Sequence, residues 1–189
     1  MGVVKLRGIA TFYDSNFEEG WRSEDLQVVF IATWDGFKHE VFTNIDLSER
    51  ILGCPINPLK EWPSNKEYVG HNLVGSQTGQ YFDLMDEVKK ITAKYLDNEG
   101  KRCSLGELAR WNQPQPLIND LGSKMRRLMA WRKGQHIKVA RWCMEDARLC
   151  YDIFTKVRRN GEIRFKDNIT GKKPFVKVNW VVRAKGEEE

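Results

Sequence analysis

The longest amphipathic segment of this chain, residues 138–160, is the feature that most constrains its fold. Its apolar side chains recur at helical spacing, which predicts a long helix with one buried face. That face carries Val139, Trp142, Cys143, Leu149, Cys150, Ile153 and Val157. Asp146 interrupts the face between Cys143 and Cys150. Because an ionised carboxylate is costly to bury alone, we expect Asp146 either in a hydrogen-bond network or in a charged site.

The composition indicates one globular domain spanning residues 1–189. The chain is 41% hydrophobic and 11% aromatic, too apolar for a disordered segment and long enough for a sizeable core. Its four cysteines form no CxxC pair and no zinc-like Cys/His spacing, which fits a reducing cytoplasm. The first ten residues lack a signal-peptide pattern, and the longest apolar run, Val28 to Ala32, is too short to cross a bilayer. We therefore expect a cytoplasmic protein with no membrane partner.

The charge distribution favours a polyanionic partner. The formal net charge is +5, and the cations crowd into residues 124–148. They are Lys124, Arg126, Arg127, Arg132, Lys133, Lys138, Arg141 and Arg148. A solvated helix face is the alternative explanation of this cluster.

The order of the expected elements predicts an α/β or α+β domain with helices packed on a mixed sheet. Strands are expected at 3–12, 26–34, 39–43, 67–71, 162–166 and 175–182. Helices are expected at 45–50, 82–96, 104–111, 123–133 and 138–160, with a proline-containing loop over 53–63. Asp35-Gly36 favours a tight turn between two strands, and Ser104 with Glu107 has the form of a capping box.

Several short segments occur in an informative order. Residues 68–73 read YVGHNL, 104–109 SLGELA, 131–135 WRKGQ, 140–149 ARWCMEDARL, 161–165 GEIRF and 178–180 VNW. In this order and spacing they resemble the motifs of the DEDD 3′ to 5′ exonucleases, and the likeness covers residues 3–182. The resemblance implies an RNase H-like mixed sheet flanked by helices, with a C-terminal β-hairpin.

The catalytic carboxylates of that family are mostly missing from the matching positions. Gly8 and Ala10 stand where the first strand of the family carries its two acids, Gln77 stands near the acid of the second motif, and Trp142 replaces a Tyr or His. Asp146 is the surviving motif acid. Because two-metal hydrolysis needs a cluster of carboxylates, we expect no cofactor and little or no nuclease activity.

The resemblance also predicts the surroundings of Asp146. We expect its carboxylate to face the first strand near residues 8–10 and to accept hydrogen bonds from Asn72, Gln77 or water in place of a metal. An Asp146 in open solvent, away from that strand, would contradict the alignment of the motifs.

The leading functional expectation is a catalytically degenerate exonuclease-like domain that serves as a nucleic-acid-binding or complex-scaffolding module. Its candidate nucleic-acid contacts are Lys124, Arg126, Arg127, Arg132, Lys133, Arg141, Asn72 and Gln77.

Two alternatives stay open. One is an active metal-dependent 3′ to 5′ exonuclease, in which Asp83, or else Asp14 or Asp86, joins Asp146 to hold Mg²⁺ or Mn²⁺. The other is a purely protein-binding subunit of a nucleoprotein or defence assembly.

Overall fold

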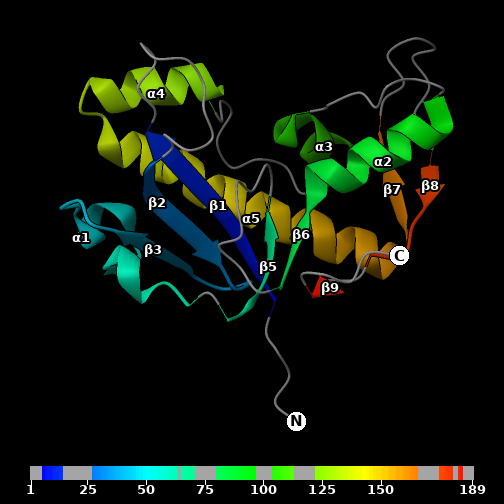
Figure 1. Ribbon diagram of the computed structural model, residues 1–189, viewed down its shortest axis with the longest axis horizontal. Helices are drawn as coiled ribbons and strands as arrows, with labels where there is room; N and C mark the ends of the chain where they lie inside the picture. The colour runs from blue at the N-terminus through cyan, green and yellow to red at the C-terminus, as the bar shows by residue number, and fades with distance from the viewer. Residues whose placement is uncertain are drawn as a thin grey trace.

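The computed structural model describes residues 6–14, 27–63, 65–70, 80–96, 104–112, 122–165, 175–180 and 183–184. In these residues the chain forms one large mixed sheet with helices packed on it, and a small two-stranded antiparallel sheet near the C-terminus (Figure 1). This confirms the expected α/β layout. No helix in the described residues is long and apolar enough to cross a membrane.

The large sheet has seven strands in the order β4-β3-β2-β1-β5-β6-β9. They are β1 (Arg7–Asp14), β2 (Gln27–Trp34), β3 (His39–Thr43), β4 (Ile56–Asn57), β5 (Glu67–Gly70), β6 (Gln80–Asp83) and β9 (Arg183–Ala184). β2 runs antiparallel to β1 and β3, whereas β5 runs parallel to β1 and β6 runs parallel to β5. The small sheet pairs β7 (Glu162–Arg164) with β8 (Phe175–Lys177).

The turn between β2 and β3 forms as predicted. The Asp35 carboxylate accepts hydrogen bonds from the backbone N–H groups of Phe37 and Lys38, both at 3.0 Å. Gly36 has φ +97°, a left-handed conformation that glycine adopts at little cost. These features fix the register of the two strands.

The helical segments surround the sheet. They are α1 (Glu49–Leu52), the 3₁₀ segment η3 (Leu59–Glu61), α2 (Leu84–Leu96), α3 (Leu105–Asn112), α4 (Lys124–Arg132) and α5 (His136–Asn160). The predicted capping box opens α3, since the Ser104 N–H donates to the Glu107 carboxylate at 2.8 Å and the Glu107 N–H donates to the Ser104 hydroxyl at 3.2 Å.

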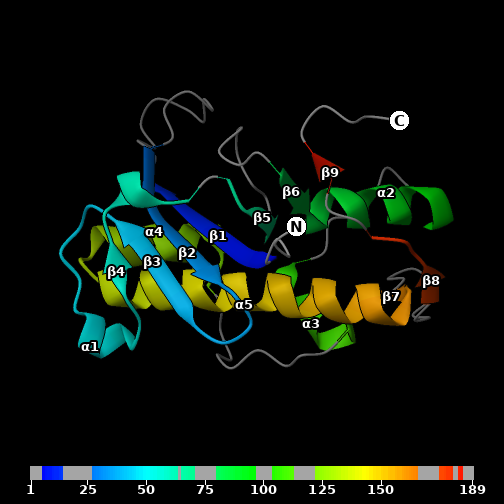
Figure 2. The same ribbon diagram turned by 90° about the horizontal axis from the view of Figure 1, so that it is seen from below.

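Helix α5 organises the core. It lies along one face of β1, β2 and β3, as Figure 2 shows. Its second half shares a hydrophobic cluster with α2 and α3. Side chains alternate between the two faces of the sheet, so that Phe30 and Ala32 face α5 whereas Ile31 faces the opposite side. There, η3 and Trp62 pack against a cluster that contains Ile31, Phe42 and Tyr68. Both faces of the central strands are therefore buried.

The structure differs from the expectations at the short elements. The helix expected at 45–50 lies at Glu49–Leu52, and the expected loop 53–63 contains β4 and η3. Residues 82–83, expected to begin a helix, end strand β6, because the Asp83 carboxylate accepts the Met85 N–H at 2.8 Å and caps α2 there. The strand expected over 175–182 is represented by β8, and β9 pairs with β6.

Candidate functional site

Asp146 of α5 forms an ion pair with Arg127 of α4. The Arg127 Nη1 donates a 2.6 Å hydrogen bond to the Asp146 Oδ2, and each side chain is only 13% exposed. The carboxylate is therefore tied into a charged network, as expected. The structure identifies Arg127 as a partner, whereas Asn72 and Gln77, the expected donors, lie outside the described residues.

The electrostatics of this pair keep Arg127 charged. Burial alone lowers the pKa of the Arg127 guanidinium, but the charge and hydrogen bond of Asp146 raise that pKa by more, so it lies above its ordinary value. The Arg127 Nε also donates to the Gly122 carbonyl oxygen at 3.0 Å. A fixed cation thus lies against the acid that the resemblance assigns to metal binding.

Strand β1 meets α5 at Gly8, where the resemblance expects a carboxylate. A β-carbon built on Gly8 would lie 1.9 Å from the carbonyl oxygen of Ala147 and 2.9 Å from the β-carbon of Tyr151. The first contact involves backbone, which cannot swing aside as a flexible side chain does. Helix α5 therefore lies so close to residue 8 that a side chain there would require β1 or α5 to move.

The other candidate metal ligands have local structural roles. The Asp14 carboxylate accepts a 3.0 Å hydrogen bond from the Trp131 indole nitrogen, and Asp83 caps α2. Asp86 is exposed in the first turn of α2, where the helix dipole favours an acid. Among the described residues no three His, Cys, Asp or Glu side chains come together as a metal-binding group. These residues therefore do not fit the two-metal centre that the resemblance implies.

The cysteines beside this site are core residues. Burial raises the pKa of Cys143 to about 12, although the neighbouring Arg127 charge lowers it, and burial raises the pKa of Cys150 as well. Both thiols are fully buried in the apolar core, where the protonated form is favoured and the side chain packs as a small apolar group.

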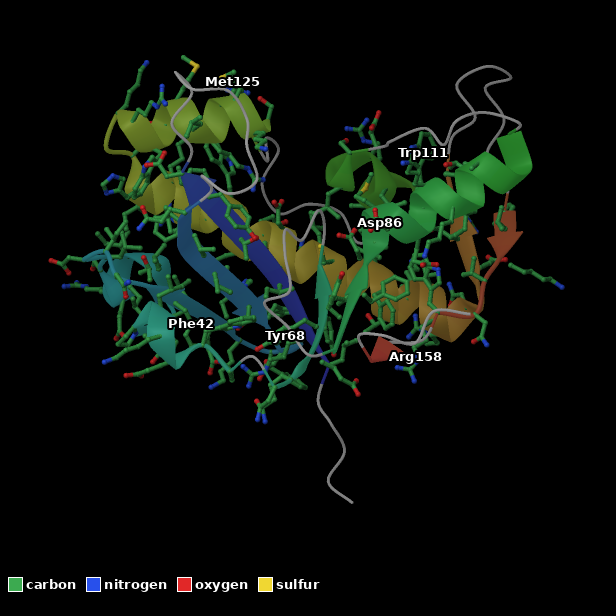
Figure 3. The ribbon with its side chains drawn as sticks, in the orientation of Figure 1. Phe42, Tyr68, Asp86, Trp111, Met125 and Arg158 are labelled. Atoms are coloured by element: carbon green, nitrogen blue, oxygen red, sulfur yellow. The ribbon has the colours of Figure 1, made fainter. Side chains whose placement is uncertain are left out.

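The exposed cations of residues 124–144 lie on α4, in the link that follows it and on the first turns of α5. Residues 124–144 contain seven Lys or Arg residues and no Asp or Glu. Apart from Arg127, all of these cations are exposed. We call this set the α4–α5 cationic surface: Lys124, Arg126, Arg132, Lys133, Lys138 and Arg141. Figure 3 shows Met125, another exposed residue of α4, on the outer side of this helix.

Two members of the original cation cluster do not belong to this surface. Arg127 points inward to Asp146, and Arg148 is engaged within α5. The Arg148 guanidinium donates to Glu145 at 2.7 Å and to Asp152 at 2.7 Å. Trp142 is 4% exposed, so it is a core residue and does not offer a stacking face.

His39 lies within electrostatic range of Glu145 and Arg148, and its burial predicts a stability that depends on pH. Its ring centroid is 4.4 Å from that of Trp34, and burial lowers the pKa of His39 below its ordinary value of 6.5, although the charge of Glu145 acts to raise it. As the pH falls through 6.5, the unfolded chain therefore takes up this proton before the folded chain does. His39 therefore contributes its full stabilisation above pH 6.5, and this contribution is lost as the pH falls from 6.5 to the lower pKa of His39 in the folded protein.

We expect the urea midpoint of the native protein to fall more between about pH 7.5 and about pH 5.5 than that of His39→Asn. Carboxylates that titrate in this range are common to both proteins, so the difference isolates the imidazole. An equal fall in the two proteins would show that His39 titrates alike in the folded and unfolded chains.

Comparison with known proteins identified no relative of this chain. No protein-family model matches this chain, and no curated protein sequence matches it. The likeness to the DEDD exonucleases therefore stays an expectation drawn from the motifs.

Proposed function

We propose that this chain is a catalytically degenerate 3′ to 5′ exonuclease-like domain that binds nucleic acid without cleaving it. The observation that carries the proposal is the α4–α5 cationic surface, whose six exposed cations lie in a segment that contains no acid. Lys and Arg side chains grouped in this way neutralise successive phosphates and release their counterions. The mixed sheet flanked by helices, with two further strands near the C-terminus, is the layout that the resemblance implies.

The loss of cleavage follows from the surroundings of Asp146. Hydrolysis by two metals requires several carboxylates that hold the ions about 4 Å apart. Here Asp146 pairs with Arg127, and Gly8 has no room for an acid. Arg127 supplies a permanent positive charge at this position, so the carboxylate is neutralised without a metal. We therefore expect this domain to bind a strand without cleaving it.

The test is charge reversal on the α4–α5 cationic surface. In Arg126→Glu/Arg132→Glu/Lys133→Glu, we expect much weaker binding to a labelled single strand of about 16 nucleotides. The slope of log affinity against log salt should become shallower by about 2, because each lost phosphate contact on a single strand removes about 0.7. Fluorescence anisotropy across a salt series measures both quantities, with DNA and RNA probes in parallel.

A matched control separates local contacts from net charge. Lys60, Lys66 and Lys89 are exposed residues outside the 124–144 segment, and reversing all three changes the net charge by the same amount. We expect this control to retain the native salt slope. Equal losses in both triple variants, or no strand binding by the native protein at low salt, would refute the proposed interface.

The length of the labelled nucleic-acid strand in the same samples tests whether the protein cleaves it. We expect it to stay intact with Mg²⁺ or Mn²⁺. Shortening that disappears in Asp146→Asn would instead indicate an active nuclease with a rebuilt site.

A further inference from the structure

Helix α4 carries an exposed pair of apolar side chains within the α4–α5 cationic surface. Met125 and Met129 are 52% and 51% exposed, and their spacing of four residues places them on the same side of the helix. The other exposed large apolar residues of the described chain lie at three separate places, Phe37 in the β2–β3 turn, Ile51 in α1 and Phe175 in β8. Isolated exposed apolar residues are ordinary, whereas a pair on one helix side forms a joint contact area.

Cations surround this pair. Arg126 lies three residues before Met129, and Arg132 and Lys133 lie three and four residues after it. All three cations are exposed, and residues 124–144 contain no acid. The outer side of α4, on which Figure 3 shows Met125, therefore combines apolar thioethers with positive charge.

The inner side of α4 holds the helix in place. Leu128 and Ala130 are buried in the cluster that also contains the first turns of α5. The Ser123 hydroxyl accepts a backbone N–H of the first turn at 3.3 Å, and Arg127 forms the ion pair with Asp146. The exposed side chains are thus presented by a helix that is already ordered, so a ligand does not have to order it on binding.

A nucleic-acid strand matches only the charges of this surface. Its phosphates attract the cations, but its bases stack on flat aromatic side chains, and a methionine side chain is flexible and has no flat face. Flexible methionines are instead typical of surfaces that bind amphipathic helices of other proteins. Apolar side chains of such a helix can exclude water from the thioethers, and its carboxylates can complement the surrounding cations.

We infer that the outer side of α4 docks an acidic amphipathic segment of a partner protein. Its apolar side chains contact Met125 and Met129, and its carboxylates lie towards Arg126, Arg132 and Lys133. The charge complementarity decides the kind of partner, since residues 124–144 supply cations and no acid. This segment covers cations that also bind the strand, so the partner regulates strand binding by competition. The competition rests on the proposed function, whereas the docking itself does not.

The test uses the full chain and two labelled peptides of about 16 residues. The first peptide has leucines at helical spacing and glutamates elsewhere, and the second has glutamine in place of each leucine. Fluorescence anisotropy should show about tenfold tighter binding of the leucine peptide, because only that peptide buries the exposed half of each methionine. Unlabelled leucine peptide should displace a labelled single strand from the native protein.

Met125→Gln/Met129→Gln removes the apolar contact area but keeps the side-chain length and the helix propensity. It should raise the Kd for the leucine peptide about tenfold and leave the Kd for the glutamine peptide unchanged. Met125→Leu/Met129→Leu should retain the native Kd for both. Phe175→Gln is the matched control, because Phe175 is 56% exposed on β8, at the opposite end of the molecule (Figure 1). It should leave both Kd values unchanged.

Equal binding of the two peptides by the native protein would overturn the docking inference, as would equal effects of Phe175→Gln and Met125→Gln/Met129→Gln. So would a loss of strand affinity in the methionine variant as large as its loss of peptide affinity, because bases would then cover the methionines. A leucine peptide that binds without displacing the strand would refute the shared surface.

The two proposals fail in different ways. A native protein that prefers the leucine peptide but binds no strand refutes the proposed function alone. One that binds the strand but does not distinguish the two peptides refutes the docking inference alone.

Discussion

Gly8→Ala should lower the free energy of unfolding by about 3 kcal/mol, the upper part of the usual range for overpacking. The added methyl group would lie 1.9 Å from the Ala147 carbonyl oxygen, so either β1 or α5 must move. Both elements are central to the core, and neither can shift without opening contacts around Ala10 and Cys143. Urea denaturation followed by tryptophan fluorescence measures the change.

Gly53→Ala provides the control for glycine replacement as such. Gly53 has φ +72°, but a β-carbon added there would have no atom within 4 Å, so this variant suffers only backbone strain. We expect it to cost about 1 kcal/mol. If Gly8→Ala costs no more than Gly53→Ala, α5 does not lie against β1 at residue 8.

Gly8→Asp extends the test to function. It restores the residue type that the exonuclease resemblance expects, yet it adds a buried charge to the steric conflict. We expect it to unfold at lower urea than Gly8→Ala and to show no nuclease activity with Mg²⁺. A folded Gly8→Asp protein that cleaves a single strand would show that the site is open.

Arg127→Met should be the second most damaging substitution. It leaves the Asp146 carboxylate, 13% exposed, without the guanidinium that lies 2.6 Å away. Removing one partner of a buried ion pair costs about 3 kcal/mol or more, because the remaining charge stays desolvated. Arg126→Met is the matched control, since Arg126 is the exposed neighbour on the same helix, and it should change stability by less than about 0.5 kcal/mol.

The double variant Arg127→Met/Asp146→Leu should recover most of the stability that Arg127→Met loses. Replacing both charges by apolar groups removes the desolvation penalty together with the attraction. A double-mutant cycle from urea midpoints should give a coupling energy of about 2 kcal/mol between the two positions. Strictly additive effects would mean that the pair does not persist in solution.

The sequence predicts the long, regular elements well because their patterns are local. Helix α5 begins within two residues of the expected position and ends at Asn160, since its apolar spacing and the following Gly161 are visible in the chain. The β2–β3 turn follows from Asp35-Gly36. The short strands β4, β6 and β9 were not predicted. A strand of two to four residues shows no clear periodicity, and its pairing depends on segments that are not adjacent in the sequence.

The candidate site could be predicted in part. The position of Asp146 on an apolar face indicated a charged partner, but its identity depends on how α4 packs on α5. One signal was present in the chain, because Arg127 lies four residues before Trp131 and therefore shares its inward face of α4. The approach of Ala147 to Gly8 depends on tertiary packing and has no counterpart in a motif.

The short edge strand β4 affects how readily this chain can self-associate through its large sheet. β4 has two residues and lies between Pro55 and Pro58, whose nitrogens cannot donate to a neighbouring strand. An edge strand that offers so few backbone groups is a poor template for the addition of another chain. The long strands β1 and β2 would be better templates for such pairing, but they lie inside the sheet, with β3 and β4 on one side and β5 and β6 on the other. The strand order therefore disfavours edge-to-edge aggregation through the β4 edge.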